Sequence, residues 1–126
     1  MKPAEIRVLV FGTFDGIHSG HDFFLQSAKT HGTKLIVGVA RDAHVMSLKG
    51  HQPKKNEETR LKEIQKHPFV DQAFLCDELL NTFHAVKNIQ PDKILLGHDQ
   101  IDLEKALVSW MEEKGLSVPL ARIDRK

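Results

Sequence analysis

Short apolar runs alternate along the chain with stretches in which apolar residues recur at helical spacing. The runs predict buried strands at residues 6–11, 35–40, 72–75, 93–96 and 118–123. The helical spacing predicts helices at residues 20–30, 57–67, 79–88 and 103–114. Strands that alternate with helices in this way form a parallel sheet covered on both faces. The pattern therefore predicts one α/β domain over residues 1–126, a doubly wound, Rossmann-like fold with a five-stranded parallel sheet.

One segment, from Ser47 to Asn56, interrupts this alternation. It is polar and basic and contains Gly50 and Pro53, so it predicts a loop. Its three lysines and one histidine would suit a loop that closes over phosphate groups. A solvated surface loop accounts for the same composition equally well.

Composition narrows the function classes without selecting one. A length of 126 residues fits a single domain, and a formal net charge of +1 gives no general attraction to nucleic acid or to an anionic membrane. No apolar stretch is long enough to span a bilayer, and the first residues do not resemble a signal peptide. The single cysteine, Cys76, cannot form an internal disulfide, so we expect a cytoplasmic protein.

The candidate chemistry is concentrated in the segment Gly12–His21, which directly follows the first predicted strand. In open α/β sheets, ligands bind beyond the carboxyl ends of the strands, and a helix start there offers free N–H groups to phosphate. His18 and His21 are three residues apart and project from one face of the opening turn. Two imidazoles placed in this way can donate hydrogen bonds to a phosphoryl group. The segment therefore predicts a polyphosphate site.

The spacing within Gly12–His21 differs from that of two common nucleotide-binding loops. Its glycines lie at positions 12, 16 and 20, which is not the spacing of a dinucleotide fingerprint, and no Gly-Lys-Ser/Thr of a Walker loop follows. A metal site would need a third ligand beside the two histidines, and none is apparent. On spacing alone, a pair of ordinary surface histidines would also account for the segment.

The complete pattern Gly-Thr-Phe-Asp-x-x-His-x-Gly-His resembles the signature of a nucleotidyltransferase superfamily that contains cytidylyltransferases and small adenylyltransferases. The resemblance extends from about residue 6 to about residue 123 and includes Leu48-Lys49-Gly50, Glu58-x-Arg60 and the segment 95–100. It implies an enzyme in which an acceptor's phosphate oxygen attacks the α-phosphorus of a nucleoside triphosphate and pyrophosphate leaves.

The resemblance also implies roles for individual residues. His18 and His21 would stabilise charge on the α-phosphate, and Lys49 would neutralise the triphosphate. The groups that bind nucleotide and phosphate would be Gly12, Thr13, Phe14, Gly20, Arg60, Gly97 and Asp99. The acceptor would lie near Asp15 and Asp42. A Mg²⁺ ion would accompany the triphosphate, and no residue is assigned as a metal ligand.

The substrates are less closely defined. Ala40-Arg41-Asp42 and the segment 96–100 are most similar to small archaeal-type FAD synthases, which implies adenylyl transfer from ATP to FMN. Cytidylyl transfer from CTP to glycerol 3-phosphate and a non-catalytic nucleotide-binding module are the alternatives. Members commonly carry a Ser/Thr-rich phosphate-binding segment near their end, where this chain has Arg122 without those hydroxyls. The resemblance further implies a homodimer, with no nucleic-acid or membrane partner.

Overall fold

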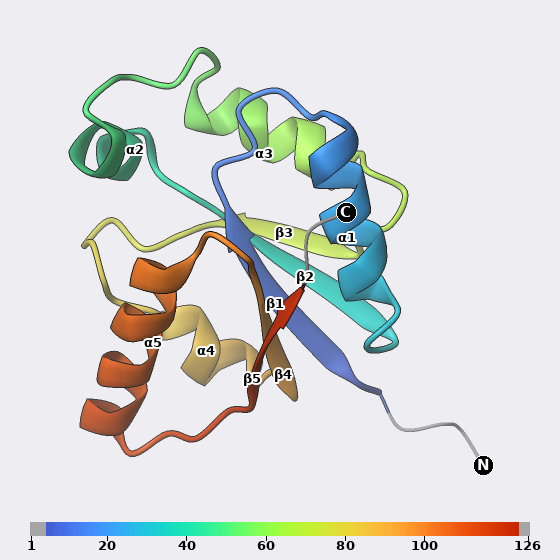
Figure 1. Cartoon of the computed structure of the whole chain (residues 1–126), viewed down its shortest axis with the longest axis vertical. Coiled ribbons are helices and arrows are strands. Elements are labelled where there is room, and N and C mark those ends of the chain that lie inside the picture. The colour runs from blue at the N-terminus through green and yellow to red at the C-terminus, as the bar shows by residue number, and fades with distance from the viewer. Residues whose placement is uncertain (1–4, 124–126) are drawn as a thin grey trace.

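The computed structural model describes residues 5–123, which form a parallel sheet with helices on both faces (Figure 1). The five strands are β1 (Arg7–Gly12), β2 (Lys34–Val39), β3 (Gln72–Leu75), β4 (Lys93–Gly97) and β5 (Leu120–Ile123), in the order β3-β2-β1-β4-β5. The chain winds outward from β1 in one direction and then from β4 in the other. The carboxyl ends of β1 and β4 therefore border the crevice at which such sheets bind ligands.

The helices divide between the two faces according to the alternation of side chains along the strands. Val8 and Val10 of β1 pack with α1 (Ser19–Lys29) and α3 (Glu57–Gln65). Leu9 and Phe11 point the other way and pack with α4 (His84–Ile89) and α5 (Ile101–Lys114). The predicted doubly wound α/β fold is confirmed. No helix within residues 5–123 combines the length and the apolar character that crossing a bilayer requires.

One helix is not predicted by the sequence pattern: α2 (Asp42–Lys49), which lies beyond the carboxyl end of β2 (Figure 1). Residues 47–49 belong to this helix, so the prediction of a loop from Ser47 was wrong at its start. Only Val45 of α2 is buried, whereas Met46 and Leu48 are exposed, so the helix has no apolar stripe that periodicity could detect. It ends at Gly50, whose positive φ of 76° provides a left-handed cap.

The predicted helix at 79–88 begins later than expected. The Asp77 carboxylate accepts hydrogen bonds from the Thr82 hydroxyl and from the backbone N–H of His84, at 2.8 and 3.0 Å. Asn81 adopts a left-handed backbone with φ of 64°. These local contacts fold the start of the predicted helix into a turn, and α4 begins only at His84.

Candidate active site

His18 and His21 hold each other in place at the start of α1. His18 is the N-cap residue, and its Nδ1 accepts a hydrogen bond from the backbone N–H of Gly20 at 3.0 Å. His21 returns the contact, because its Nδ1 accepts from the backbone N–H of His18 at 3.3 Å. The two rings stack with centroids 3.8 Å apart. The pair is thus a capping box built from imidazoles.

This capping determines which ring nitrogen carries the proton. A neutral imidazole has one acceptor nitrogen and one N–H, and in both rings the acceptor is Nδ1. The proton therefore resides on Nε2 in both residues. A helix N-terminus also offers unpaired backbone N–H groups and a positive dipole end. The start of α1 consequently presents hydrogen-bond donors suited to an anion.

The environment of His21 favours its neutral form. Burial lowers the pKa of His21 below its ordinary value of 6.5, and the charge of the adjacent His18 lowers it further. Lys49 at the end of α2 lowers it in the same direction, which places this lysine within electrostatic range of the histidine pair. These effects outweigh the hydrogen bond to the Gly16 backbone and the charge of Asp22, both of which raise the pKa.

A pH dependence of stability follows from this lowered pKa. The unfolded chain takes up a proton on His21 more readily than the folded chain, so acid favours unfolding. The stabilisation is complete above about pH 6.5 and is lost as the pH falls through the folded pKa. Thermal unfolding between about pH 5 and 8 should show this loss in the wild type and less of it in His21→Gln. The exposed His31 provides the matched control, His31→Gln, which should keep the wild-type profile. Identical profiles for all three proteins would contradict the prediction.

Phe14 supports His21 from the side of the sheet. Its ring is buried, at 3% exposure, and meets the His21 ring edge-on with centroids 5.3 Å apart. A Cβ atom at Gly12 would lie 2.6 Å from Cε2 of this ring. Gly12 is therefore needed to accommodate Phe14, which differs from the phosphate-binding role that the resemblance implies. Gly20 has a similar role, since a Cβ there would lie 2.9 Å from the His18 ring.

The resemblance implies that Arg60 binds the triphosphate. In the structure its guanidinium is instead engaged with other parts of the protein. Its side chain is completely buried, and its guanidinium donates to the carbonyl of Thr13 at 2.8 Å, the carbonyl of Lys55 at 2.9 Å and Oδ1 of Asp42 at 2.6 Å. Buried charges in proteins are generally paired in this way. Through these contacts Arg60 joins the loop after β1, the segment before α3 and the start of α2.

The two candidate acceptor residues are engaged with the protein. The Asp15 carboxylate accepts from the backbone N–H groups of Lys54 and Lys55, at 2.7 and 2.9 Å. The bond from Lys54 is the main reason that the pKa of Asp15 is lowered. Asp42 is bound by Arg60 through its side chain, and its backbone N–H donates to the Glu57 carboxylate at 2.9 Å. Both residues thus fasten the segments around the histidine pair.

The side chain of Gln100 links the carboxyl ends of β1 and β4, a contact that the sequence does not predict. Its side-chain amide donates to the Phe11 carbonyl at 2.9 Å and accepts from the Gly97 N–H at 2.8 Å. Gly97 and the exposed Asp99 lie beside it, and a Cβ at Gly97 would be 3.3 Å from Asp99 Oδ1. In the sequence, this contact is marked only by a glutamine that follows Gly-x-Asp. That pattern does not reveal that the glutamine bonds to a residue of another strand.

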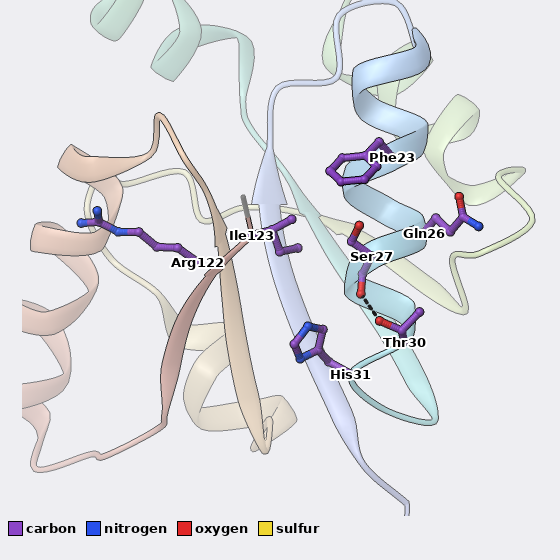
Figure 2. A pocket seen from close by; sticks show the side chains of 7 residues that line it. All are labelled: Phe23, Gln26, Ser27, Thr30, His31, Arg122 and Ile123. Carbon is purple, nitrogen blue, oxygen red and sulfur yellow. Dashed lines mark hydrogen bonds between the residues drawn. The ribbon is translucent and has the colours of Figure 1, made fainter. Parts of the chain in front are cut away.

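A separate hollow of about 540 Å³ lies between α1 and β5 (Figure 2). Its lining comprises Phe23, Gln26, Ser27, Thr30, His31, Arg122 and Ile123. Arg122 extends away from α1 toward α5, where it pairs with Glu104 at 2.9 Å (Figure 2). The hollow does not include the stacked histidines. Within residues 5–123 there is also no group of three or more His, Cys, Asp or Glu side chains arranged to hold a metal ion.

The chain is similar to known proteins over most of its length. The chain is 37% identical over 121 residues to an FAD synthase of Methanohalophilus mahii, covering 94% of this chain and 82% of the relative. It is 42% identical over 118 residues to an FAD synthase of Methanococcoides burtonii, covering 94% and 80%. The crystal structure of the lipopolysaccharide core biosynthesis protein from Thermoplasma volcanium has a TM-score of 0.87 at 36% identity, covering 98% of this chain and 99% of that one.

The family description "Cytidylyltransferase-like" matches residues 9–126, a range that contains the histidine pair, Lys49 and Gln100. The match therefore covers all of the sheet except the first two residues of β1, together with the site at its carboxyl edge. The chain belongs to the cytidylyltransferase-like family, and it is a nucleotidyltransferase.

Proposed function

We propose that this chain is an FMN adenylyltransferase, that is, an FAD synthase. The observation that carries the proposal is the stacked pair His18 and His21 at the N-terminus of α1. The choice of FMN and ATP is supported by the relatives named FAD synthase, which are 37% and 42% identical over most of the chain.

In the proposed reaction an oxygen of the FMN phosphate forms a bond to the α-phosphorus of ATP. The bond from that phosphorus to the bridging oxygen breaks, and its electron pair leaves with pyrophosphate. Negative charge builds on the oxygens of the α-phosphate during this step. The Nε2–H groups of His18 and His21 and the N-terminus of α1 are the groups we assign to that charge.

The other residues that we propose to contact the nucleotide lie along the carboxyl ends of the strands. Lys49 neutralises the triphosphate from α2, and the backbone of Thr13 and Phe14 lines the phosphate site. Gly97 and Asp99 border the nucleoside beyond β4. Magnesium arrives as part of the substrate MgATP, bound to phosphate oxygens, which are ligands that it prefers. We also propose a cytoplasmic homodimer that acts on small molecules.

The test is product formation with matched and exchanged substrates. Purified protein with ATP and FMN should release pyrophosphate and form FAD in equal amounts, measured by coupled assay and chromatography. The alternative substrates, CTP and glycerol 3-phosphate, are tested as a second pair. Two exchanged pairs, ATP with glycerol 3-phosphate and CTP with FMN, show which substrate determines the outcome. Turnover only with CTP and glycerol 3-phosphate would show that these are the substrates and that ATP and FMN are not. Nucleotide binding without turnover by any pair would indicate a non-catalytic module.

Lys49→Ala should raise the KM for ATP about tenfold, corresponding to the loss of about 1.4 kcal/mol of binding free energy. The reason is that an exposed ammonium group at the end of α2, within electrostatic range of His21, is suited to the β- and γ-phosphates. Steady-state kinetics with saturating FMN measure this change. Lys114→Ala, an exposed lysine at the end of α5, is the control and should leave KM unchanged. An unaltered KM in Lys49→Ala would mean that this lysine is a solvated surface residue and does not bind the triphosphate.

A further inference from the structure

Phe14 occupies an unfavourable backbone conformation at the centre of the site. Its φ is 54°, in the left-handed region that non-glycine residues seldom adopt. Such a conformation persists only where the surrounding structure holds it. Within the described residues, the other non-glycine positions with positive φ are Asn81 and Gln90, which lie far along the chain. The contacts that hold Phe14 are therefore of functional interest.

Both neighbours of Phe14 are fixed by the same distant segment, residues 54–60, which we call the 54–60 clamp. Before Phe14, the carbonyl of Thr13 accepts from Arg60 Nη1 at 2.8 Å. After it, the Asp15 carboxylate accepts from the backbone N–H groups of Lys54 and Lys55. Two residues of the clamp are also bonded to each other, because Arg60 Nε donates to the carbonyl of Lys55 at 2.9 Å.

The central charge of the clamp is enclosed by protein. Arg60 has no exposed surface, and the carboxylate of Asp42 at the start of α2 pairs with its Nη2 at 2.6 Å. Its Nε, Nη1 and Nη2 atoms each donate to a protein oxygen. An arginine arranged in this way holds loops together and has no open path to a phosphate.

The position of Phe14 is transmitted to the histidines by direct contact. The Phe14 ring meets the His21 ring edge-on, at 63° and 5.3 Å, and the His21 ring stacks on the His18 ring at 3.8 Å. Aromatic packing of this kind fixes the orientation as well as the distance of the rings. A shift of Phe14 would therefore move the two groups that we assign to the α-phosphate.

We propose that Arg60 is a positioning residue, which holds Phe14 in its left-handed conformation and thereby keeps His21 and His18 stacked in the orientation needed for transfer. The kinetic part of this inference rests on the proposed function, whereas the structural part does not. In this assignment Arg60 acts on turnover and not on binding of the triphosphate.

Arg60→Lys is the principal test, because lysine keeps the charge but cannot donate to three separated oxygens. We expect kcat for FAD formation to fall by about 10²-fold, the loss that follows a displacement of about 1 Å in an active site. The KM for ATP should change little. Ile64→Ala is the matched control: Ile64 is completely buried on the same helix, outside the clamp. It should lower the Tm without a selective loss of kcat, in assays kept well below the Tm of each variant.

A second measurement is independent of enzymatic activity. The pKa of His21, followed through its ring proton resonance by NMR, should rise toward its ordinary value when the stack loosens. This rise is expected in Arg60→Lys and in Asp15→Ala, which opens the other side of the clamp, but not in Ile64→Ala. If Arg60→Lys does not fold, Asp15→Ala still decides the outcome.

Two results would overturn the proposal. A raised KM for ATP with unchanged kcat in Arg60→Lys would mean that Arg60 binds the triphosphate directly. An unchanged pKa of His21 in folded Arg60→Lys or Asp15→Ala would mean that the clamp does not position the histidines. If the wild type forms no FAD, the proposed function fails, while the NMR measurement still tests the clamp.

Discussion

His21→Ala should lower kcat for FAD formation by about 10²–10³-fold, the usual cost of removing one hydrogen-bond donor from a developing oxyanion. The fold should survive, because the side chain is only partly buried and its removal deletes one capping bond, worth about 1 kcal/mol. Steady-state kinetics and circular dichroism on the same preparation measure both effects.

His31→Ala is the matched control for this loss. His31 follows the other end of α1 and is exposed, so its removal tests whether any histidine near this helix affects turnover. It should leave kcat unchanged. Near-normal turnover in His21→Ala would remove His21 from the proposed mechanism, and a loss of structure in that variant would assign it to folding.

Gly12→Ala should be the most destabilising small substitution in the site. The new Cβ would lie 2.6 Å from Cε2 of the buried Phe14 ring, so the ring or the end of β1 must move. Overpacking of this kind costs about 1–3 kcal/mol, and about 4 °C of Tm accompanies each kcal/mol in a domain of this size. Because Phe14 contacts His21, kcat should fall as well. Thermal unfolding and kinetics together measure the effect.

The double variant Gly12→Ala with Phe14→Leu separates the two consequences. A smaller side chain at position 14 makes room for the new Cβ, so much of the lost Tm should return. The edge-on contact with His21 is absent in this variant, so kcat should remain low. Full recovery of kcat together with Tm would show that the Phe14 ring fills space and does not orient His21.

The fold and the family could be predicted from the sequence because both depend on local patterns. Apolar runs such as 6–11 mark buried strands wherever they pack, and the confirmed family resemblance is carried by consecutive residues from Gly12 to His21. The helix α2 had no such pattern, since of its apolar side chains Val45 is buried while Met46 and Leu48 are exposed. Its position was visible only in three dimensions.

The roles of the charged residues were harder to predict because their partners are distant in the sequence. Arg60 and the Thr13 carbonyl are 47 residues apart, and Gln100 and the Phe11 carbonyl are 89 apart. An arginine in the first turn of a helix is electrostatically unfavourable and therefore suggests another purpose. The sequence could not show whether that purpose was a ligand or, as the contacts of Arg60 indicate, the protein's own backbone.

Under the proposed mechanism, the use of His18 as a helix cap places stability and activity in competition at one position. Serine, threonine, aspartate and asparagine are the residues preferred at an N-cap. Selection for thermostability alone would therefore favour replacing His18, and each such replacement would discard an Nε2–H donor. A thermostable variant obtained by screening should be sequenced at position 18 first, because under the proposed mechanism the substitutions that strengthen the cap there also remove a donor to the α-phosphate.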